Sequence, residues 1–446
     1  MLKNLKSMGL AEYSRLSGSD MVRELTKRTD SEIISLFEAH TLRHEKRWAL
    51  IALGGYGRSD LCPYSDLDLL LLIENRKSRA EIESIVEAML YPLWDKGFNA
   101  SYSVRTIKET LKDAKRDFFF RTSLIDMRFI CGSDLPFKEL NKVLEKNRAL
   151  NNTRRFMSDL LFHTRMRQEK YGDVSYILEP DIKDGHGGLR DYHAVAWASC
   201  ILSHGGFPIS DILPINERHR LDDAYDFMVK TRFMLHELSG RKNDRMYLEY
   251  QEALAENLGF KEGNAESGVE AFMRHFYKMA LTIRSLSDDF LLSLAHMLGL
   301  IKSPPNRLID NHFQVFSGQL AFRHSKVLES RPHLIMHAFE LISQKDYTLS
   351  PSARSDIRDL LVKGCDLRHN TLAHEAFFRV LLSQDPGRGL TGMLELGIFE
   401  CFIPEFETIK GRTIFDLYHT YTVDIHSINT ITELKRLEHN EVTCSR

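Results

Sequence analysis

Two apolar runs separated by a short polar stretch form the clearest pattern in the chain. Residues 49–53 are all apolar and end at Gly54-Gly55, and residues 67–73 form a second run that Asp68 alone interrupts. Runs of this length, bounded by turn residues, are typical of buried strands. The pattern therefore predicts two strands with a polar turn between them.

Helical periodicity precedes these strands. Apolar residues recur at helical spacing around Ile33 and Phe37, so residues 1–46 are predicted to form helices. Asp20 and Asp30-Ser31 belong to the residue types that cap helix N-termini, and both positions are predicted N-caps.

Helix and strand patterns alternate after the second strand. Helices are predicted over residues 80–94 and 106–115, and residues 98–104 alternate like a strand. Residues 124–131 form a short apolar run, predicted to be extended, that contains one acid, Asp126. These elements predict a small α+β domain.

The pattern from about residue 150 to 400 is mainly helical. One long helix is predicted around residues 227–238 and another over residues 270–300. Pro304-Pro305 interrupts the pattern and predicts a joint between helical layers, and residues 349–354 are a second break.

Composition narrows the class of protein. The chain has 446 residues, 43% of them hydrophobic and 27% charged, which predicts about two to four domains of an ordinary globular protein. The formal net charge of −2 gives no overall positive field, so no nucleic-acid partner is expected. The six cysteines form no Cys-x-x-Cys pair, and no apolar run is long enough for a leader or a membrane span. We therefore expect a cytoplasmic protein without a membrane partner.

The carboxylates of Asp66 and Asp68 are the first candidate site. Side chains alternate along a strand, so both lie on one face, with Leu67 and Leu69 on the other. Two adjacent carboxylates repel each other, and a divalent cation with hard oxygen ligands relieves that repulsion. The flexible backbone at Gly54-Gly55 allows the close approach of an anionic phosphate. The alternative is a buried strand whose aspartates only cap a loop.

Asp126 is a candidate third acid for the same site. Metal-dependent phosphoryl transfer commonly uses bridging carboxylates with a further acid nearby. The alternative is that Asp126 is a helix-surface acid paired with Arg128 or Arg121.

Three further motifs carry candidate chemistry. Residues 179–191 combine three glycines with charged residues, and this segment predicts either a phosphate-binding loop that uses Lys183 or Arg190, or a structural loop with a pair between Arg190 and Asp191. Residues 240–245 form a basic loop, which is usually only solvated. Two histidines lie seven residues apart near two aspartates, and a metal site there is imaginable but incomplete; these residues are His419, His426, Asp416 and Asp424.

In this order, the motifs resemble those of the bacterial PII-protein uridylyltransferase/uridylyl-removing enzymes, within the DNA polymerase β-type nucleotidyltransferase superfamily. The resemblance rests on three motifs: the Gly-Gly-x-Gly-Arg…Ser-Asp-x-Asp-Leu pattern over residues 54–69, the Thr-Ser-Leu-Ile-Asp-Met-Arg run at 122–128, and the Lys-x-x-x-Gly-Gly-Leu-Arg-Asp segment at 183–191. The run at 415–426 resembles the start of the family's HD hydrolase domain.

The resemblance implies an α+β fold with a polymerase β-type nucleotidyltransferase domain, a mainly helical domain and a truncated HD-domain stub. The expected segments are N-terminal helices at 1–46, the nucleotidyltransferase domain at 47–150, the associated helical domain at 151–402 and the incomplete HD domain at 403–446.

The implied reaction is Mg²⁺-dependent transfer of UMP from UTP to a tyrosine of the PII signalling protein, with release of pyrophosphate. Asp66 and Asp68 would bind Mg²⁺, and Asp126 would act as the third catalytic acid. The residues implied in nucleotide binding are Gly54, Gly55, Arg58, Ser65, Lys183 and Arg190.

The family continues beyond the region matched here into a full HD domain and two glutamine-sensing ACT domains. We therefore expect neither uridylyl removal nor glutamine sensing from this chain, and only loose order after about Val423. Two rival functions remain open: transfer of AMP or UMP to another protein, and a non-catalytic remnant.

Overall fold

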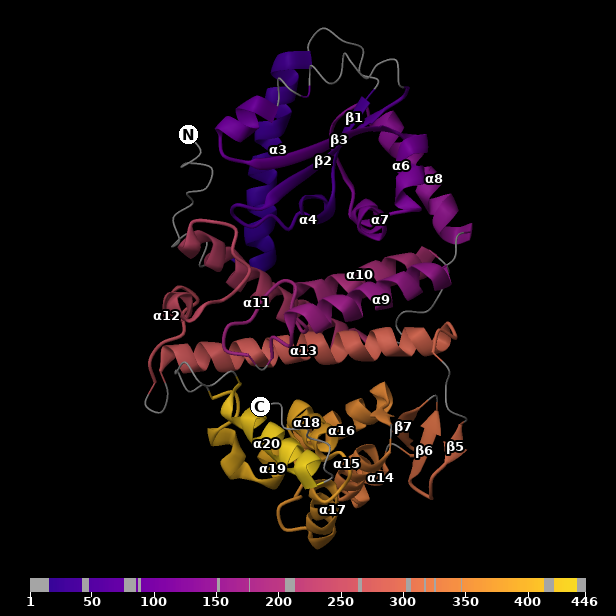
Figure 1. Cartoon of the computed structure of the whole chain (residues 1–446), viewed down its shortest axis with the longest axis vertical. Coiled ribbons are helices and arrows are strands. Elements are labelled where there is room, and N and C mark those ends of the chain that lie inside the picture. The colour runs from indigo at the N-terminus through magenta and orange to yellow at the C-terminus, as the bar shows by residue number, and fades with distance from the viewer. Residues whose placement is uncertain are drawn as a thin grey trace. The chain divides into compact units, whose positions relative to one another are not determined.

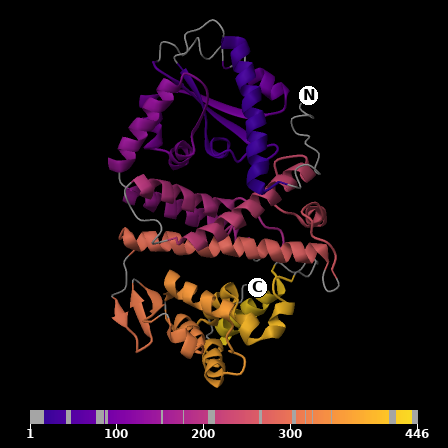
Figure 2. The same cartoon turned by 180° about the vertical axis from the view of Figure 1, so that it is seen from behind.

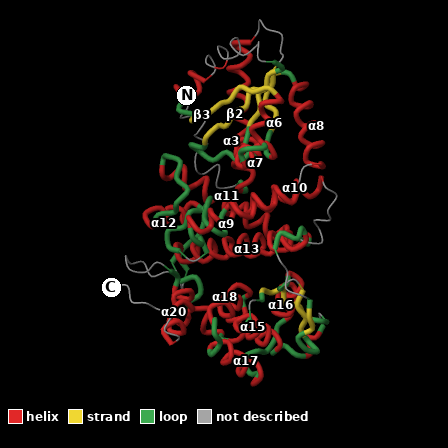
Figure 3. Tube along the Cα trace, turned by 45° about the vertical axis from the view of Figure 1, so that its right-hand side comes forward, coloured by secondary structure: helices red, strands yellow, loops and turns green. Residues whose placement is uncertain are grey.

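The computed structural model describes residues 16–41, 48–75, 86, 90–150, 153–175, 177–204, 213–263, 267–301, 306–316, 318–324, 326–345, 347–412 and 421–438. Its contacts divide the chain into two compact units. The first comprises residues 1–174, 179–272 and 282–284, and the second comprises residues 175–178, 273–281 and 285–446. Most of the described trace is helical, with short strands in each unit (Figure 3). This mixed α+β class is the one expected from the sequence.

The first unit contains a mixed sheet with the order β3-β2-β1-β4. Its strands are β1 (Trp48–Ala52), β2 (Asp66–Ile73), β3 (Asn99–Thr106) and β4 (Arg128–Gly132). β1 is antiparallel to β2 and β4, and β2 is parallel to β3. The strands predicted from the two apolar runs and from residues 98–104 are thus confirmed.

Three helices cover one face of this sheet: α6 (Ile107–Ala114), α7 (Phe118–Ile125) and α8 (Asp134–Leu150). Apolar side chains of β1 and β2 pack against them in one buried cluster, which includes Ile51, Leu72, Leu124 and Leu140. The predicted helix at 106–115 is confirmed as α6, whose N-cap Thr106 forms a capping box with Glu109. The predicted helix at 80–94 lies largely outside the described residues.

α3 (Gly18–Thr41) lies on the opposite side of the sheet from α6 and α8 (Figures 1 and 2). It packs on the sheet through Phe37, whose ring centroid lies 4.7 Å from that of Trp48. The predicted N-caps are wrong, because Asp30 lies within this continuous helix and Asp20 lies in its first turn. The amides of Gly18 and Ser19 instead donate to the carboxylate of Asp226, at 2.9 and 2.8 Å.

The same unit contains α9 (Thr153–Tyr171), α10 (Leu189–His204), α11 (Ile215–Ser239) and α12 (Leu248–Asn257). α13 (Gly268–Met297) contributes residues to both units. α11 and α13 confirm the two long helices predicted from their apolar periodicity. None of the described helices is both long enough and apolar enough to cross a membrane.

The second unit has a small sheet with the order β5-β6-β7-β8, which the prediction of a mainly helical region missed. The strands are β5 (Arg307–Leu308), β6 (Phe313–Phe316), β7 (Gln319–Phe322) and β8 (Thr348–Leu349). These strands are too short to show a period-two pattern. The helices are α14 (Val327–Ser330), α15 (Leu334–Gln344), α16 (Pro351–Lys363), α17 (Thr371–Leu381), α18 (Pro386–Leu396), α19 (Ile398–Phe402), the 3₁₀ helix η3 (Pro404–Thr408) and α20 (Val423–Glu438).

The expectation of loose order after Val423 is contradicted by α20. Ile425 and Ile428 on this helix are 4% and 3% exposed and belong to the core of the second unit. The sequence pattern was too short to reveal this packing, because α20 packs against α18, which lies earlier in the chain.

Gly57 provides a test of how the first sheet meets α7. It ends the short helix α4 (Gly54–Gly57), and a Cβ there would lie 2.2 Å from the carbonyl oxygen of Asp126 and 2.9 Å from that of Ala52. We expect Gly57→Ala to lower the free energy of unfolding by about 1–3 kcal/mol, because backbone atoms must move. Urea denaturation measures this change.

Gly55→Ala is the matched control, because its Cβ would meet only the end of the Arg58 side chain, at 3.8 Å. It should change stability by less than about 0.5 kcal/mol. Equal effects of the two substitutions would contradict the close approach of α4 to Asp126.

Candidate active site

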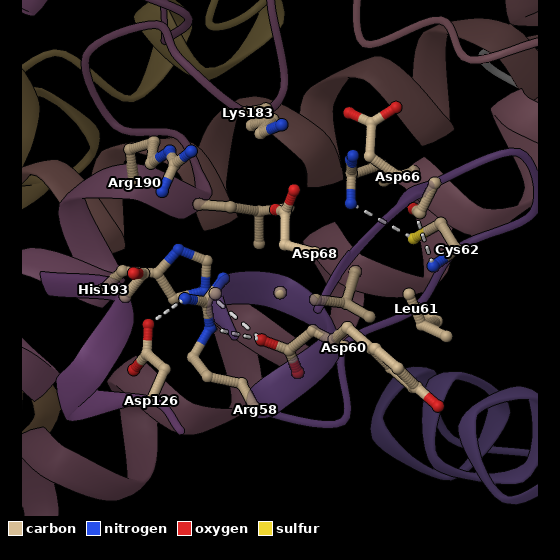
Figure 4. A pocket seen from close by; sticks show the side chains of 18 of the residues that line it. Arg58, Asp60, Leu61, Cys62, Asp66, Asp68, Asp126, Lys183, Arg190 and His193 are labelled. Atoms are coloured by element: carbon tan, nitrogen blue, oxygen red, sulfur yellow. Dashed lines mark hydrogen bonds and ion pairs between the residues drawn. The ribbon is translucent and has the colours of Figure 1, made fainter. Parts of the chain in front are cut away.

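One pocket of the first unit collects most of the predicted site residues (Figure 4). It has a volume of about 250 Å³ and lies between α4, the start of β2, and the loops before α10 and after α11. The residues implied by the sequence that line it are Gly54, Gly55, Arg58, Ser65, Asp66, Asp68, Asp126, Lys183 and Arg190.

Asp66 and Asp68 lie at the start of β2, where the strand leaves the core. Leu67 and Leu69 are buried, whereas Asp66 is half-buried and Asp68 is exposed, so the two carboxylates share the other face. Parallel pairing with β3 sets a polar partner beside each of them. The Asn99 amide donates to Asp66 at 2.5 Å, and the Ser101 hydroxyl donates to Asp68 at 2.8 Å. Asn99 and Ser101 thereby orient the carboxylates, and without the strand register the sequence could not identify them.

The glycine turn at Gly54-Gly55 lies close to the Asp68 carboxylate. Gly54 has a φ of +55°, and a Cβ there would lie 3.7 Å from Asp68 Oδ2. Ser65 closes the other end of the connection, where its hydroxyl accepts from the Cys62 amide at 3.1 Å. The turn therefore leaves backbone close to the carboxylates, with little side-chain bulk in between.

Arg58 is bound between two carboxylates. Its Nε donates to Asp60 Oδ2 at 2.8 Å, and its Nη1 donates to Asp126 Oδ2 at 2.5 Å. Burial alone would lower the pKa of Arg58, but Asp126 and Asp60 raise it well above its usual value. Because the guanidinium is committed to these partners, it contributes to the pocket as part of an ion-pair network.

Asp126 differs from its expected surroundings. It follows the last residue of α7 and precedes β4, so it does not lie in an extended run, and neither predicted alternative partner contacts it. Its carboxylate accepts from the Trp197 indole at 3.0 Å as well as from Arg58. Arg128 binds Asp30, and Arg121 binds Asp159.

Helices α10 and α11 join this network through Asp60. The Tyr225 hydroxyl donates to Asp60 Oδ1 at 2.7 Å, and His193 Nε2 lies 3.5 Å from Asp60 Oδ2. Burial, with the charge of Arg58, lowers the pKa of His193 to about 3, so this imidazole is neutral near pH 7. The sequence assigned no role to Asp60, His193, Trp197 or Tyr225, because the contacts that give them one join α10 and α11 to segments distant along the chain.

The glycine-rich segment at 179–191 is folded by its own hydrogen bonds. The Asp181 carboxylate accepts from the amides of Lys183 and Asp184, and Asp191 accepts from Gly187. The remaining amides from residue 182 to 191 donate to backbone carbonyls. All backbone N–H groups of this stretch are thus paired within the protein, those of Ile182 and His186 with carbonyls outside the loop (Asp244 and Gly172), so the loop offers side chains and not amides to a ligand.

Lys183 and Arg190 are those side chains. In Figure 4 they lie across the pocket from Arg58 and Asp126, with Asp68 between the two sides. Burial lowers the pKa of each. The predicted structural pair between Arg190 and Asp191 is wrong: Asp191 binds Arg167, and Arg190 Nε lies 3.4 Å from Asp184.

The basic loop at 240–245 also reaches the pocket, which the sequence did not predict. Asp244 anchors it, because this carboxylate accepts from Arg232 Nε at 2.7 Å and lies 2.9 Å from His236 Nε2. Lys242 contacts Asp66 Oδ2. The only hint in the sequence was a run of charges between two predicted helices.

The donor set of Asp66 and Asp68 fits a magnesium ion. Mg²⁺ in proteins is commonly held by one or two carboxylates, with the other positions filled by water and substrate phosphates. Within the described ranges no three acidic, histidine or cysteine side chains gather as a metal cluster. Of the histidine motif near the C-terminus, Asp416 and His419 lie outside the described residues, His426 is exposed, and Asp424 accepts from the Gly411 amide at 2.9 Å.

The α+β fold and the carboxylate pair beside a glycine turn are consistent with a nucleotidyltransferase domain. Residues 155–291 match the family model described as GlnD PII-uridylyltransferase. This range includes the segment at 179–191 and the loop at 240–245. This match confirms the resemblance that the motifs indicated.

Curated relatives extend the match to most of the chain. The bifunctional uridylyltransferase/uridylyl-removing enzyme of Azospirillum brasilense is 30% identical over 96% of this chain and 48% of its own length. Those of Erythrobacter litoralis and Pseudomonas fluorescens are each 31% identical, over 89% and 96% of this chain and 45% and 49% of their lengths. The chain thus spans about half the length of the curated relatives it matches.

The network around Arg58 gives a stability test. We expect Arg58→Met to lower the free energy of unfolding by about 3–5 kcal/mol, because it leaves the buried carboxylates of Asp60 and Asp126 without their cation. Urea denaturation followed by circular dichroism measures this loss.

Arg165→Met is the control, since Arg165 pairs with Glu169 on the exposed surface of α9. It should cost less than about 1 kcal/mol. A loss for Arg58→Met no larger than that of the control would show that the network does not hold the unit together.

Proposed function

We propose that this chain is a nucleotidyltransferase that moves UMP from UTP to a tyrosine hydroxyl of a PII protein and releases pyrophosphate. The observation that carries the proposal is the pair Asp66 and Asp68, exposed at a strand end within one pocket that also holds several cationic side chains. The substrate assignment is supported by the match of residues 155–291 to the GlnD PII-uridylyltransferase family. In the reaction, the acceptor oxygen bonds to the α-phosphorus as the bond from that phosphorus to pyrophosphate breaks.

Asp66 and Asp68 are proposed to hold Mg²⁺. When bound, the ion neutralises charge on the phosphate oxygens during transfer. Asn99 and Ser101 keep the two carboxylates turned toward the pocket through the hydrogen bonds described above. Such outer partners commonly fix the orientation of metal ligands.

Lys183 and Arg190 are proposed to bind the triphosphate through their side chains. Both side chains are largely buried, and the reduced screening by solvent strengthens their attraction to phosphate. Gly54, Gly55 and Ser65 are proposed to line the path of the triphosphate, where the absence of side chains at the glycines leaves room beside Asp68.

Arg58 and Asp126 are proposed to support the site through their ion pair. Asp126 was expected as a third acid, but its oxygens are bound by Arg58 and Trp197. In this arrangement the Asp126 carboxylate fixes the Arg58 guanidinium, which in turn binds Asp60 in the segment that follows the glycine turn. We therefore assign Asp126 a positioning role.

A labelling assay tests the function directly. The chain is incubated with Mg²⁺, a PII protein and UTP carrying a radioactive α-phosphate, and PII is separated and counted. Label on PII together with release of pyrophosphate is expected. Parallel reactions with the other three nucleoside triphosphates and with PII lacking its acceptor tyrosine define the base and the acceptor.

Other outcomes distinguish the rivals. Labelling with ATP in place of UTP, or of another protein in place of PII, would contradict the substrate assignment while keeping the reaction class. No labelling of any acceptor by a folded chain would contradict the proposed enzyme.

Asp66→Asn and Asp68→Asn test the metal site. Each should reduce transfer by at least about a thousandfold, because loss of a ligand charge removes electrostatic stabilisation of the transition state. Stability should change little, since the substitution relieves carboxylate repulsion. The initial rate of PII labelling measures the effect.

Asp134→Asn serves as the control, because Asp134 is an exposed acid in the same unit, paired with Lys138. It should leave the rate unchanged. Transfer near the wild-type rate in either site variant would refute the assignment of Asp66 and Asp68.

A further inference from the structure

Lys242 differs from the other cations of the pocket in its partner. Four further Lys and Arg side chains line the pocket among the described residues, and each is paired with an acid outside the proposed metal pair: Arg58 with Asp60 and Asp126, Lys183 and Arg232 with Asp244, and Arg190 with Asp184. Lys242 is paired with Asp66 itself. A cation therefore already sits on one of the two carboxylates assigned to the metal.

The loop that carries Lys242 is fixed at both ends. Gly240 ends α11 in a left-handed conformation with a φ of +64°, and Asp244 is held by Arg232 and His236. Between these anchors the Lys242 side chain is 41% exposed. It has a long flexible stem, so its ammonium can move within the pocket while the loop stays in place.

A divalent cation on Asp66 and the Lys242 ammonium beside it would repel each other, because both are positively charged and lie on the same carboxylate. The lysine offsets the repulsion between Asp66 and Asp68, and a divalent cation does so more strongly because of its higher charge. A metal that binds Asp66 therefore competes with the ammonium, and a triphosphate that arrives with the metal offers the ammonium new anionic partners.

We propose that Lys242 is a phosphate-binding residue of the nucleotide site that competes with the divalent cation for Asp66 and is transferred to the triphosphate when metal and nucleotide bind together. This assignment rests on the proposed function and adds a residue to its site. It makes metal binding alone unfavourable and couples it to the nucleotide, because the nucleotide removes the competitor.

Removal of the lysine should therefore change two affinities in opposite directions. In Lys242→Met, Mn²⁺ should bind about two- to fivefold more tightly without nucleotide, the range expected for loss of an exposed ion pair. The α,β-methylene analogue of UTP, measured with saturating Mn²⁺, should bind about tenfold more weakly. Electron paramagnetic resonance of free Mn²⁺ and calorimetry measure these constants without turnover.

Arg241→Met is the matched control, since it removes the same charge from an exposed neighbour in the same loop. It should change both affinities by less than about twofold, and Lys242→Arg should retain most of the analogue affinity. Mn²⁺ affinity in Lys242→Met no higher than in Arg241→Met, or unchanged analogue affinity, would overturn the assignment. A folded wild-type chain that binds neither Mn²⁺ nor the analogue would overturn the proposed function, and this assignment with it.

Discussion

The ion pairs of Arg58 with both Asp60 and Asp126 are the interactions on which the first unit most depends. These carboxylates belong to the segments after α4 and after α7, and they are bound in turn by Tyr225 and Trp197 of α11 and α10. One buried cation thus connects the sheet domain to the helices that supply the other wall of the pocket. A buried charge network of this kind tolerates the loss of no single member, because each loss leaves an uncompensated charge.

The buried ion-pair network around Arg58 differs from the charged side chains that face the pocket beside it. Asp66 and Asp68 each accept one hydrogen bond from β3, Asp66 is also paired with Lys242, and both carboxylates line the pocket. The amides of the loop at 179–191 are paired within the loop and with neighbouring segments, so the loop presents Lys183 and Arg190 from a fixed backbone. The site therefore combines fixed backbone with exposed charge, an arrangement suited to binding a polyanion together with its metal.

The parts of the fold and of the site that depend on neighbouring residues in the sequence could be predicted. The apolar runs around Gly54-Gly55 gave β1 and β2, and alternation placed Asp66 and Asp68 on one face. Non-local partners could not be predicted. Asn99 requires the register of β3, and Lys242 lies 176 residues from the Asp66 that it contacts. Asp30 was assigned as a cap because its residue type favours caps, whereas in the structure it accepts hydrogen bonds from Tyr56 and Arg128.

The central claim is that Asp66 and Asp68 together hold the divalent cation that binds the phosphates of a nucleoside triphosphate. Anomalous diffraction from crystals of the chain grown with Mn²⁺ and a non-hydrolysable UTP analogue tests it most directly. The account predicts an anomalous peak at about 2.0–2.3 Å from carboxylate oxygens of both residues, with the triphosphate extending toward Lys183 and Arg190. A nucleotide bound in the pocket with its metal on other residues, or with no metal near β2, would contradict it.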